Sequence, residues 1–471
     1  MMGPSSSWRT PHALTLGVLF SIGVASGVVF GGLAAPWHPL WHLLHNFGAP
    51  ARALWVLTGL ATITAAVLSF HNATWIFEHR YHLVAALVVS LGAINGINFG
   101  RLDIFDVVFL PIAAFWFATS VVEQRPQRTP WPVLVFMGLI AIAAVDSIVN
   151  GRDVSIFSLH TILAKLALAF FTANLLVSLE VQRATLRIFL VMATGTAVLA
   201  LAFTAIHFFT GFEISFVDAA SERYKFTPFG KLLRATGFTQ SPQTLGHYLL
   251  IALAVTLVTP VRKWIAGLFA VLYLAAIAAT LSMGAITVAA VIVVAAPILR
   301  SPAYMLHYFI GYVLAGCALF FSGLGHIAYD KIIDPMTAVG VSRRLELARG
   351  GIEGILAHPY LGAGIMNFGR ELKLPVHNAY LQATFEIGLL GGLAYIALLV
   401  YLLANLIVLT LKADDDQDRR WLAAITLGQM AVMLHLSFEP LFLHVVPWIY
   451  FGIATATIQI YRDKRMKEYF A

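Results

Sequence analysis

Long apolar blocks alternate with short polar segments along almost the whole chain, and this pattern predicts a bundle of membrane-spanning helices. Each block holds 17–25 residues, which is the length that an α-helix needs to cross a hydrocarbon core of roughly 30 Å. We expect fourteen spans, at 13–35, 52–70, 82–99, 104–122, 131–149, 157–179, 186–210, 244–260, 264–282, 284–300, 304–322, 387–411, 420–437 and 442–461. The expected fold class is an all-α integral membrane protein with about 12–14 transmembrane helices.

Two longer polar segments interrupt the apolar pattern and divide the chain into five regions. In order, these are N-terminal helices at 1–210, a loop at 211–243, helices at 244–322, a larger loop at 323–386, and C-terminal helices with a tail at 387–471. The first apolar run is longer than the apolar part of a signal peptide, which has about 7–15 residues. We therefore expect it to remain in the protein as the first span.

Composition excludes a protein made of soluble domains. Hydrophobic residues make up 59% of the chain, charged residues make up only 11%, and the mean hydropathy is +0.83. A water-soluble protein carries about 25% charged residues. The net charge of +7 carries little weight by itself, because in a membrane protein the position of the cations matters more than their number. We expect membrane lipids, and no nucleic acid, among the partners.

The positions of lysine and arginine predict that both termini are cytoplasmic. With the N-terminus inside, the short outer loops hold three cations, Arg52, Arg101 and Arg152. The cytoplasmic segments hold sixteen: Arg9, Arg80, Arg125, Arg128, Arg183, Arg187, Arg262, Lys263, Arg300, Lys412, Arg419, Arg420, Arg462, Lys464, Arg465 and Lys467. This excess follows the positive-inside rule and places both long loops outside the cytoplasm. We expect a multi-pass protein of the bacterial inner membrane with its chemistry on the periplasmic face.

The two long outer loops contain a series of polar and glycine motifs. In chain order these are Arg234-Ala-Thr-Gly237 before Pro242, the pair Arg343-Arg344, His358-Pro359 before Gly362-Ala-Gly364, and His377-Asn378 nine residues before Gly388-Leu-Leu-Gly391. In this order and on one side of the membrane, they resemble the O-antigen ligase and O-antigen polymerase superfamily. The histidine motif with its Gly-x-x-Gly is most similar to the ligases. The resemblance covers about residues 230–400 by motif.

The resemblance implies a metal-independent glycosyltransferase that needs no cofactor. Such enzymes take a glycan from an undecaprenyl-diphosphate carrier and join it to a hydroxyl of an acceptor sugar. For an O-antigen ligase, which we favour, the acceptor is the lipid A-core. The alternative is a polymerase of O-antigen, capsule or exopolysaccharide, whose acceptor is a second carrier-linked glycan. A protein O-oligosaccharyltransferase agrees less well with the sequence. Two segments, 241–243 and 282–284, depart from the superfamily's usual Asn-Pro-Asn and Ser-Arg-Gly.

The chemistry of this transfer assigns roles to three residues. A diphosphate is a good leaving group, and arginine stays charged while binding two phosphate oxygens at once. We therefore expect Arg234 and Arg344 to hold the diphosphate without a metal. The acceptor hydroxyl must lose a proton, and we expect His377 to accept it, because imidazole titrates near neutral pH. The alternatives are head-group anchoring for the arginines and an ordinary interfacial role for the histidine.

Three neighbours of these residues are predicted to contact the substrates. Asn378 follows the candidate base, and Arg343 is the weaker candidate of the arginine pair. Glu386 is expected to bind sugar hydroxyls or to orient an arginine, and its alternative is a solvated helix end. Gly388 and Gly391 have the spacing of small residues at close helix contacts, so we expect both to pack against a neighbouring helix.

Lys165 lies inside an expected span, where a charge is costly and indicates a function or a structural partner. We expect it to contact the carrier diphosphate, or to form a structural pair with Asp146 or Asp106. A secondary transporter is an alternative class for the whole protein, but it would concentrate charges in the middle of its spans. Lys165 is nearly alone there, which disfavours a transporter.

Overall fold

A computed structural model of the chain describes residues 73–93, 98–99, 102–123, 129–149, 156–212, 224–227, 230–260, 262–301, 304–321, 334–360, 362–365, 367–368 and 377–470. Within these residues the fold consists of thirteen helices and two short antiparallel hairpins. The expected all-α membrane class is therefore confirmed. The expected spans at 13–35 and 52–70 lie outside the described residues.

Twelve of the described helices correspond to the twelve other expected spans. They are α4 (Ala73–Ala93), α5 (Ile104–Glu123), α6 (Trp131–Val149), α7 (Ile156–Leu175), α8 (Leu179–Thr210), α10 (Pro242–Val258), α11 (Lys263–Ala279), α12 (Met283–Arg300), α13 (Met305–Phe321), α17 (Ala379–Leu411), α18 (Asp416–Leu436) and α19 (Val445–Phe470). Of these, α8, α12 and α17 are each long and apolar enough to cross a membrane. The largest differences in where a helix begins are at α4 and α17, which start at Ala73 and Ala379 rather than at 82 and 387.

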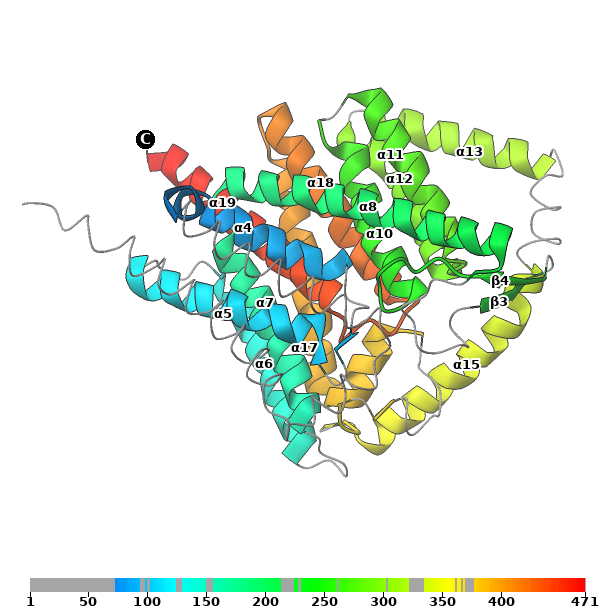
Figure 1. Ribbon diagram of the computed structural model, residues 1–471, viewed down its shortest axis with the longest axis horizontal. Helices are drawn as coiled ribbons and strands as arrows, with labels where there is room; N and C mark the ends of the chain where they lie inside the picture. Colours follow the sequence, from blue (N-terminus) through cyan, green and yellow to red (C-terminus); the bar gives the residue numbers. More distant parts are fainter. Residues whose placement is uncertain are drawn as a thin grey trace, which may run out of the picture.

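The two long loops contain elements that the apolar pattern did not predict. In the first loop, β3 (Tyr224–Thr227) pairs with β4 (Gly230–Leu233). In the second, α15 (Asp334–Ala357) forms a helix of 24 residues. Figure 1 shows β3, β4 and α15 on the side of the molecule away from the C-terminus. A further short hairpin, β1 (Asn98–Phe99) with β2 (Leu102–Asp103), precedes α5.

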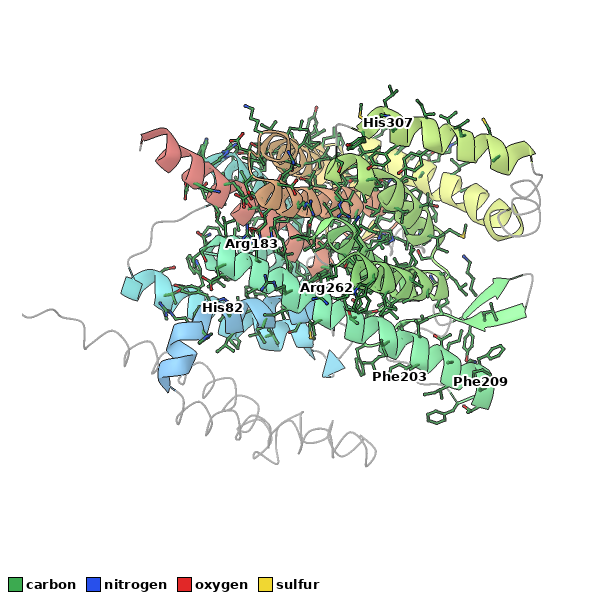
Figure 2. The ribbon with its side chains drawn as sticks, turned by 90° about the horizontal axis from the view of Figure 1, so that it is seen from above. His82, Arg183, Phe203, Phe209, Arg262 and His307 are labelled. Atoms are coloured by element: carbon green, nitrogen blue, oxygen red, sulfur yellow. The ribbon has the colours of Figure 1, made fainter. Side chains whose placement is uncertain are left out.

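Helix α10 forms the centre of the bundle. Nearly all its side chains are buried, as expected of a helix that is apolar on every side. It packs against α8, α11, α12 and α18. Ser241 caps the helix, because its hydroxyl oxygen accepts the N–H of Thr244 at 3.1 Å. Pro242 follows at the first helical position, where its missing N–H has no intrahelical partner to lose. Figure 2 shows α8 crossing the bundle from Arg183 near one end to Phe209 near the other.

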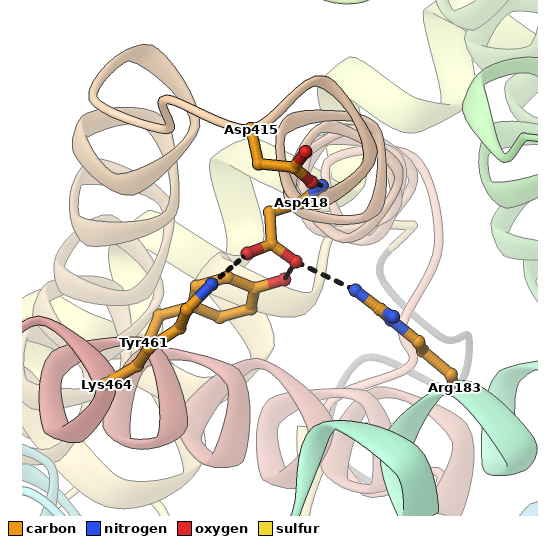
Figure 3. Close-up of polar contacts among 5 residues, drawn as sticks. All are labelled: Arg183, Asp415, Asp418, Tyr461 and Lys464. Carbon is orange, nitrogen blue, oxygen red and sulfur yellow. Dashed lines mark hydrogen bonds and ion pairs between the residues drawn. The ribbon is translucent and has the colours of Figure 1, made fainter.

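A cluster of ion pairs joins three helices at one end of the bundle. The buried Asp418 of α18 accepts hydrogen bonds from Arg183 of α8 at 2.8 Å, from Lys464 of α19 at 2.6 Å and from the hydroxyl of Tyr461 at 3.0 Å (Figure 3). Asp415 caps α18 by accepting the N–H of Asp418 at 2.8 Å. Arg183 and Lys464 come from segments that the charge pattern assigned to the same side of the membrane, and these segments do lie together.

Candidate active site

His377 lies just before α17, and the next residue, Asn378, caps the N-terminus of this helix. The side-chain oxygen of Asn378 accepts the N–H groups of Tyr380 and Leu381, both at 3.0 Å. This contact satisfies two of the N–H groups that the first turn of a helix leaves without a partner. The asparagine of the His-Asn motif therefore holds the backbone beside the histidine, and its predicted contact with substrate remains a prediction.

The imidazole of His377 faces Glu439, in the connector 437–444 between α18 and α19. The Nδ1 atom of His377 lies 3.3 Å from Oε2 of Glu439, and the two side chains are 29% and 3% exposed. A carboxylate at Nδ1 favours the tautomer that carries its proton there, which leaves the Nε2 lone pair to accept a proton. This is the arrangement of a general base with an acidic residue that orients it.

Two cations of the first long loop attach to the turn between α11 and α12. The Nε atom of Arg234 donates to the carbonyl of Thr280 at 2.9 Å, and the Nζ atom of Lys225 donates to the carbonyl of Leu281 at 2.8 Å. The backbone N–H of Ala235 also donates to a carbonyl of α11, at 2.9 Å. The carbonyls of Ala279 and Thr280 lie at the negative end of the α11 dipole, which favours cations beside it.

Ser282 connects this turn to Glu439. Its hydroxyl donates to Oε1 of Glu439 at 3.2 Å, while the other carboxylate oxygen faces His377. The connector approaches the start of α12 so closely that a Cβ atom at Gly284 would lie 2.6 Å from Cβ of Phe438. The positive end of the α12 dipole favours a carboxylate at this place. The turn 280–282 therefore brings Arg234, and through Glu439 also His377, to one region.

Lys165 is buried in α7, and its Nζ atom lies 3.7 Å from the centre of the Phe105 ring. Its charge acts on His444, which belongs to the connector 437–444 and precedes α19. Burial first and the charge of Lys165 second lower the pKa of His444 to about 4, against the opposite effect of Glu439. Lys165 and Glu439 therefore share an electrostatic environment. The predicted pair with Asp146 remains a prediction, and the side chain of Asp106 lies outside the described residues.

Helix α17 is interrupted one turn after Thr384, where Ile387 and Gly388 leave helical geometry. Residues 359–360 and 362–364, which include the Gly-Ala-Gly motif, fill the interruption. Three backbone hydrogen bonds join these residues to α17. The N–H of Ala363 donates to the carbonyl of Phe385 at 2.7 Å, and the N–H of Gly364 donates to the carbonyl of Glu386 at 3.1 Å. In the other direction, the N–H of Leu389 donates to the carbonyl of Pro359 at 2.9 Å. The two glycine motifs, which lie more than twenty residues apart in the chain, thus form one structural unit.

Three glycines of this unit, Gly362, Gly388 and Gly391, have no room for a side chain. Gly362 and Gly388 have φ values of 71° and 69°, which side chains disfavour. A Cβ at Gly362 would lie 2.5 Å from the carbonyl oxygen of Glu386, and one at Gly388 would overlap the carbonyl of Tyr360. The predicted close helix packing is confirmed at Gly391, where a Cβ would lie 2.8 Å from Cβ of Ala143 in α6. At Gly388 the glycine instead permits the helix to break.

The unit also fixes the end of α15 against the beginning of α17. A Cβ at Gly351 would lie 2.9 Å from a methyl carbon of Leu381, and one at Gly354 would overlap the ring of Phe385. Arg343 and Arg344 belong to the backbone of α15, but their side chains lie outside the described residues. The helix that carries them is therefore attached to the turns that directly follow His377.

Glu386 is 1% exposed, and its Oε1 atom accepts a hydrogen bond from Gln382 at 3.0 Å. The alternative of a solvated helix end is therefore wrong. Glu386 lies just before the break in α17, and its backbone carbonyl accepts the N–H of Gly364. Its predicted contact with sugar hydroxyls or with an arginine remains a prediction.

Glu439, Lys225 and the turn 280–282 were not predicted as parts of the site. Glu439 had a usable signal, since it is an acidic residue followed by proline in the four-residue gap between the last two expected spans. Lys225 had no comparable motif. Among the described residues, no group of three or more histidine, cysteine, aspartate or glutamate side chains is placed to hold a metal ion.

Part of the chain matches a known family. Residues 268–396 match a family model described as O-antigen ligase. The matched segment includes the turn 280–282, α15, His377 and the interrupted part of α17, and it ends before Glu439. No curated protein sequence matches the chain. The match confirms the resemblance to the O-antigen ligase superfamily and supports a function of the O-antigen ligase or polymerase type.

Proposed function

Because the chain carries an O-antigen ligase domain at residues 268–396, we propose that it transfers a glycan from an undecaprenyl-diphosphate carrier to a sugar hydroxyl of the lipid A-core. The reaction takes place on the periplasmic face of the bacterial inner membrane. One observation carries the proposal: the pairing of His377 with the buried Glu439. An oriented imidazole beside a carboxylate suits a reaction whose nucleophile is a hydroxyl that must lose its proton.

In the proposed mechanism, His377 is the general base. Its Nε2 atom takes the proton of the acceptor hydroxyl as that oxygen attacks the anomeric carbon of the donor glycan. The bond between the anomeric carbon and the diphosphate oxygen breaks, and its electron pair leaves with the carrier diphosphate. By contacting Nδ1, Glu439 keeps the proton-accepting Nε2 atom of His377 on the far side of the ring. It also stabilises the imidazolium that forms. Glu439 is thus a positioning residue.

The cations stabilise the negative charge that develops on the leaving diphosphate. Arg234 and Arg344 are proposed to bind its oxygens, an interaction that strengthens as the bond to the sugar breaks. Lys225, attached beside Arg234, adds positive charge to the same region. With arginine performing this role, no metal ion or other cofactor is required. Arg343, Asn378, Glu386 and Lys165 are proposed to support substrate binding around this centre.

Deletion of the gene, followed by analysis of the lipopolysaccharide, tests the proposal. A ligase deletion leaves lipid A-core without O-antigen, while full-length carrier-linked polymer accumulates. Wild-type protein should restore the modified core, whereas His377→Ala should be present in the membrane at normal amounts and restore nothing. Core that bears a single repeat unit would identify a polymerase instead. Unchanged lipopolysaccharide would contradict the proposed acceptor.

A further inference from the structure

Helix α15 has an apolar stripe on its exposed face. Leu345, Ile352 and Leu356 are 67%, 52% and 73% exposed. Their spacing of seven and four residues places them within about 40° of one another around the helix. Tyr360, in the turn that follows the helix, is 81% exposed. We call these four residues the α15 stripe.

The stripe is distinct from the face by which α15 contacts the rest of the protein. The opposite face contains Gly351 and Gly354, which lie against α17. Charged residues follow one edge of the stripe, where Arg349 and Glu353 form an exposed ion pair at 3.1 Å. An apolar stripe with a charged edge is typical of a helix that lies in the plane of a membrane interface. In water, each large apolar side chain left exposed forgoes the stabilisation that its burial would give.

The α15 stripe ends beside an exposed apolar surface of α17. Its last member, Tyr360, lies at the break in α17, since a Cβ at Gly388 would overlap its carbonyl. The residues of α17 directly after the break include Leu389, Leu390 and Leu393, which are 39%, 50% and 60% exposed. Helix α17 is long and apolar enough to span a membrane, and in a bilayer the leucines exposed on its surface would contact acyl chains. The stripe therefore extends this apolar surface onto the second long loop.

We propose that α15 is an interfacial helix that lies at the periplasmic surface of the inner membrane. Its stripe of Leu345, Ile352, Leu356 and Tyr360 is inserted among the acyl chains of the bilayer lipids. A functional consequence follows, and it rests on the proposed function. Helix α15 carries Arg343 and Arg344, and its insertion would hold them at the level of the lipid head groups. The diphosphate of a carrier lipid is presented at that level.

Cys317 is the single cysteine of the chain, so a Cys317→Ser variant provides a background for site-directed spin labels. Nitroxides are attached to cysteines at Ile352 or Leu356 and, as matched controls on the same helix, at the exposed Glu346 or Glu353. The full chain is placed in phospholipid nanodiscs, and collisions with oxygen and with the water-soluble nickel chelate NiEDDA are compared by electron paramagnetic resonance. Collisions with oxygen should predominate for nitroxides at positions 352 and 356, and collisions with NiEDDA should predominate at positions 346 and 353. Equal NiEDDA access at all four positions, or protection of 352 and 356 from both reagents, would overturn the proposal, since the stripe would then face water or protein.

The double variant Ile352→Gln/Leu356→Gln tests the consequence for transfer. It should insert and remain folded, as judged by thermal unfolding in detergent. Glycan transfer should fall by about 5-fold or more, which corresponds to ~1 kcal/mol in activation free energy. Lipid contact at the labelled positions together with normal transfer by the double variant would reject the role in positioning the arginines. The collision measurement does not depend on catalysis, so its outcome tests the position of α15 independently of the proposed function.

Discussion

The Nδ1 atom of His377 lies 3.3 Å from the Oε2 atom of Glu439, a residue 62 positions later in the chain. The contact joins the start of α17 to the connector between α18 and α19. It therefore depends on how α17 and α18 pack against each other. Because the other oxygen of Glu439 accepts a hydrogen bond from Ser282, the carboxylate is held from two sides and can hold the imidazole in turn.

Glu439→Gln should preserve the shape of this contact while removing its charge. The amide no longer stabilises an imidazolium, and it can bind the wrong tautomer of His377. We expect the turnover number to fall roughly 10- to 100-fold, equivalent to about 1.4–2.7 kcal/mol, with unchanged binding of carrier-linked glycan. The exposed Glu353→Gln is the matched control and should retain full activity. Normal turnover by Glu439→Gln would remove Glu439 from the mechanism.

Arg344→Lys should reduce transfer more than Arg343→Lys. Lysine keeps the charge but loses the planar group that binds two phosphate oxygens. One such contact made in the transition state is worth roughly 1.5–3 kcal/mol, so a loss of at least about 10-fold is expected at position 344. Initial rates of both variants with purified carrier-linked donor provide the comparison. A critical position 343 beside a dispensable 344 would reverse the assignment.

Transfer by the purified protein should continue in EDTA without added divalent ions. The reason is that the proposed charge stabilisation comes from guanidinium groups, whose charge does not depend on a metal. Rates are compared after extensive chelation and after readdition of Mg²⁺ or Mn²⁺. A strict requirement for either ion would show that the diphosphate is held by residues other than Arg234 and Arg344.

Gly388→Ala should destabilise the protein by more than about 2 kcal/mol, because it combines a disfavoured φ with overlap onto the carbonyl of Tyr360. Gly195→Ala in α8 is the control, since no atom lies within 4 Å of a Cβ there. In a helix interior that change should be neutral or stabilise by up to ~1 kcal/mol. Thermal unfolding in detergent measures both. Similar unfolding temperatures for the two variants would mean that the break does not need a glycine.

The spans were predictable because bilayer thickness fixes the length of each apolar block. The same signal fails where a helix leaves the apolar layer. For α17 the pattern predicted a start at 387, which is the interruption, while the preceding turns from Ala379 mix polar and apolar residues. Helix α15 escaped prediction because it is apolar only along a stripe and on its glycine-containing inner face.

For the candidate site, motif spacing selected His377 and Arg234 as candidates, but it did not predict which groups hold their side chains. Glu439 reaches His377 only through the packing of α17 and α18, and no spacing rule describes that distance. Arg234 is held by backbone carbonyls of a turn, which have no side-chain signature. In that turn, Leu281 has a φ of 52°, an unusual conformation for a residue other than glycine. Such a feature appears only in the folded chain.

The environment of His444 predicts an acid-dependent loss of stability. Its pKa is about 4 in the folded protein, below the ordinary value of 6.5, because of burial and the nearby Lys165. Between pH 6.5 and 4 the unfolded chain therefore binds a proton that the folded chain does not, so acid favours unfolding. At pH 5 this one group should lower the free energy of unfolding by roughly 2 kcal/mol relative to pH 7.5. His444→Gln should show a smaller fall in unfolding temperature between these pH values than the wild type, whereas the exposed His358→Gln should match the wild type. An unaltered pH dependence in His444→Gln would mean that another group carries the acid sensitivity.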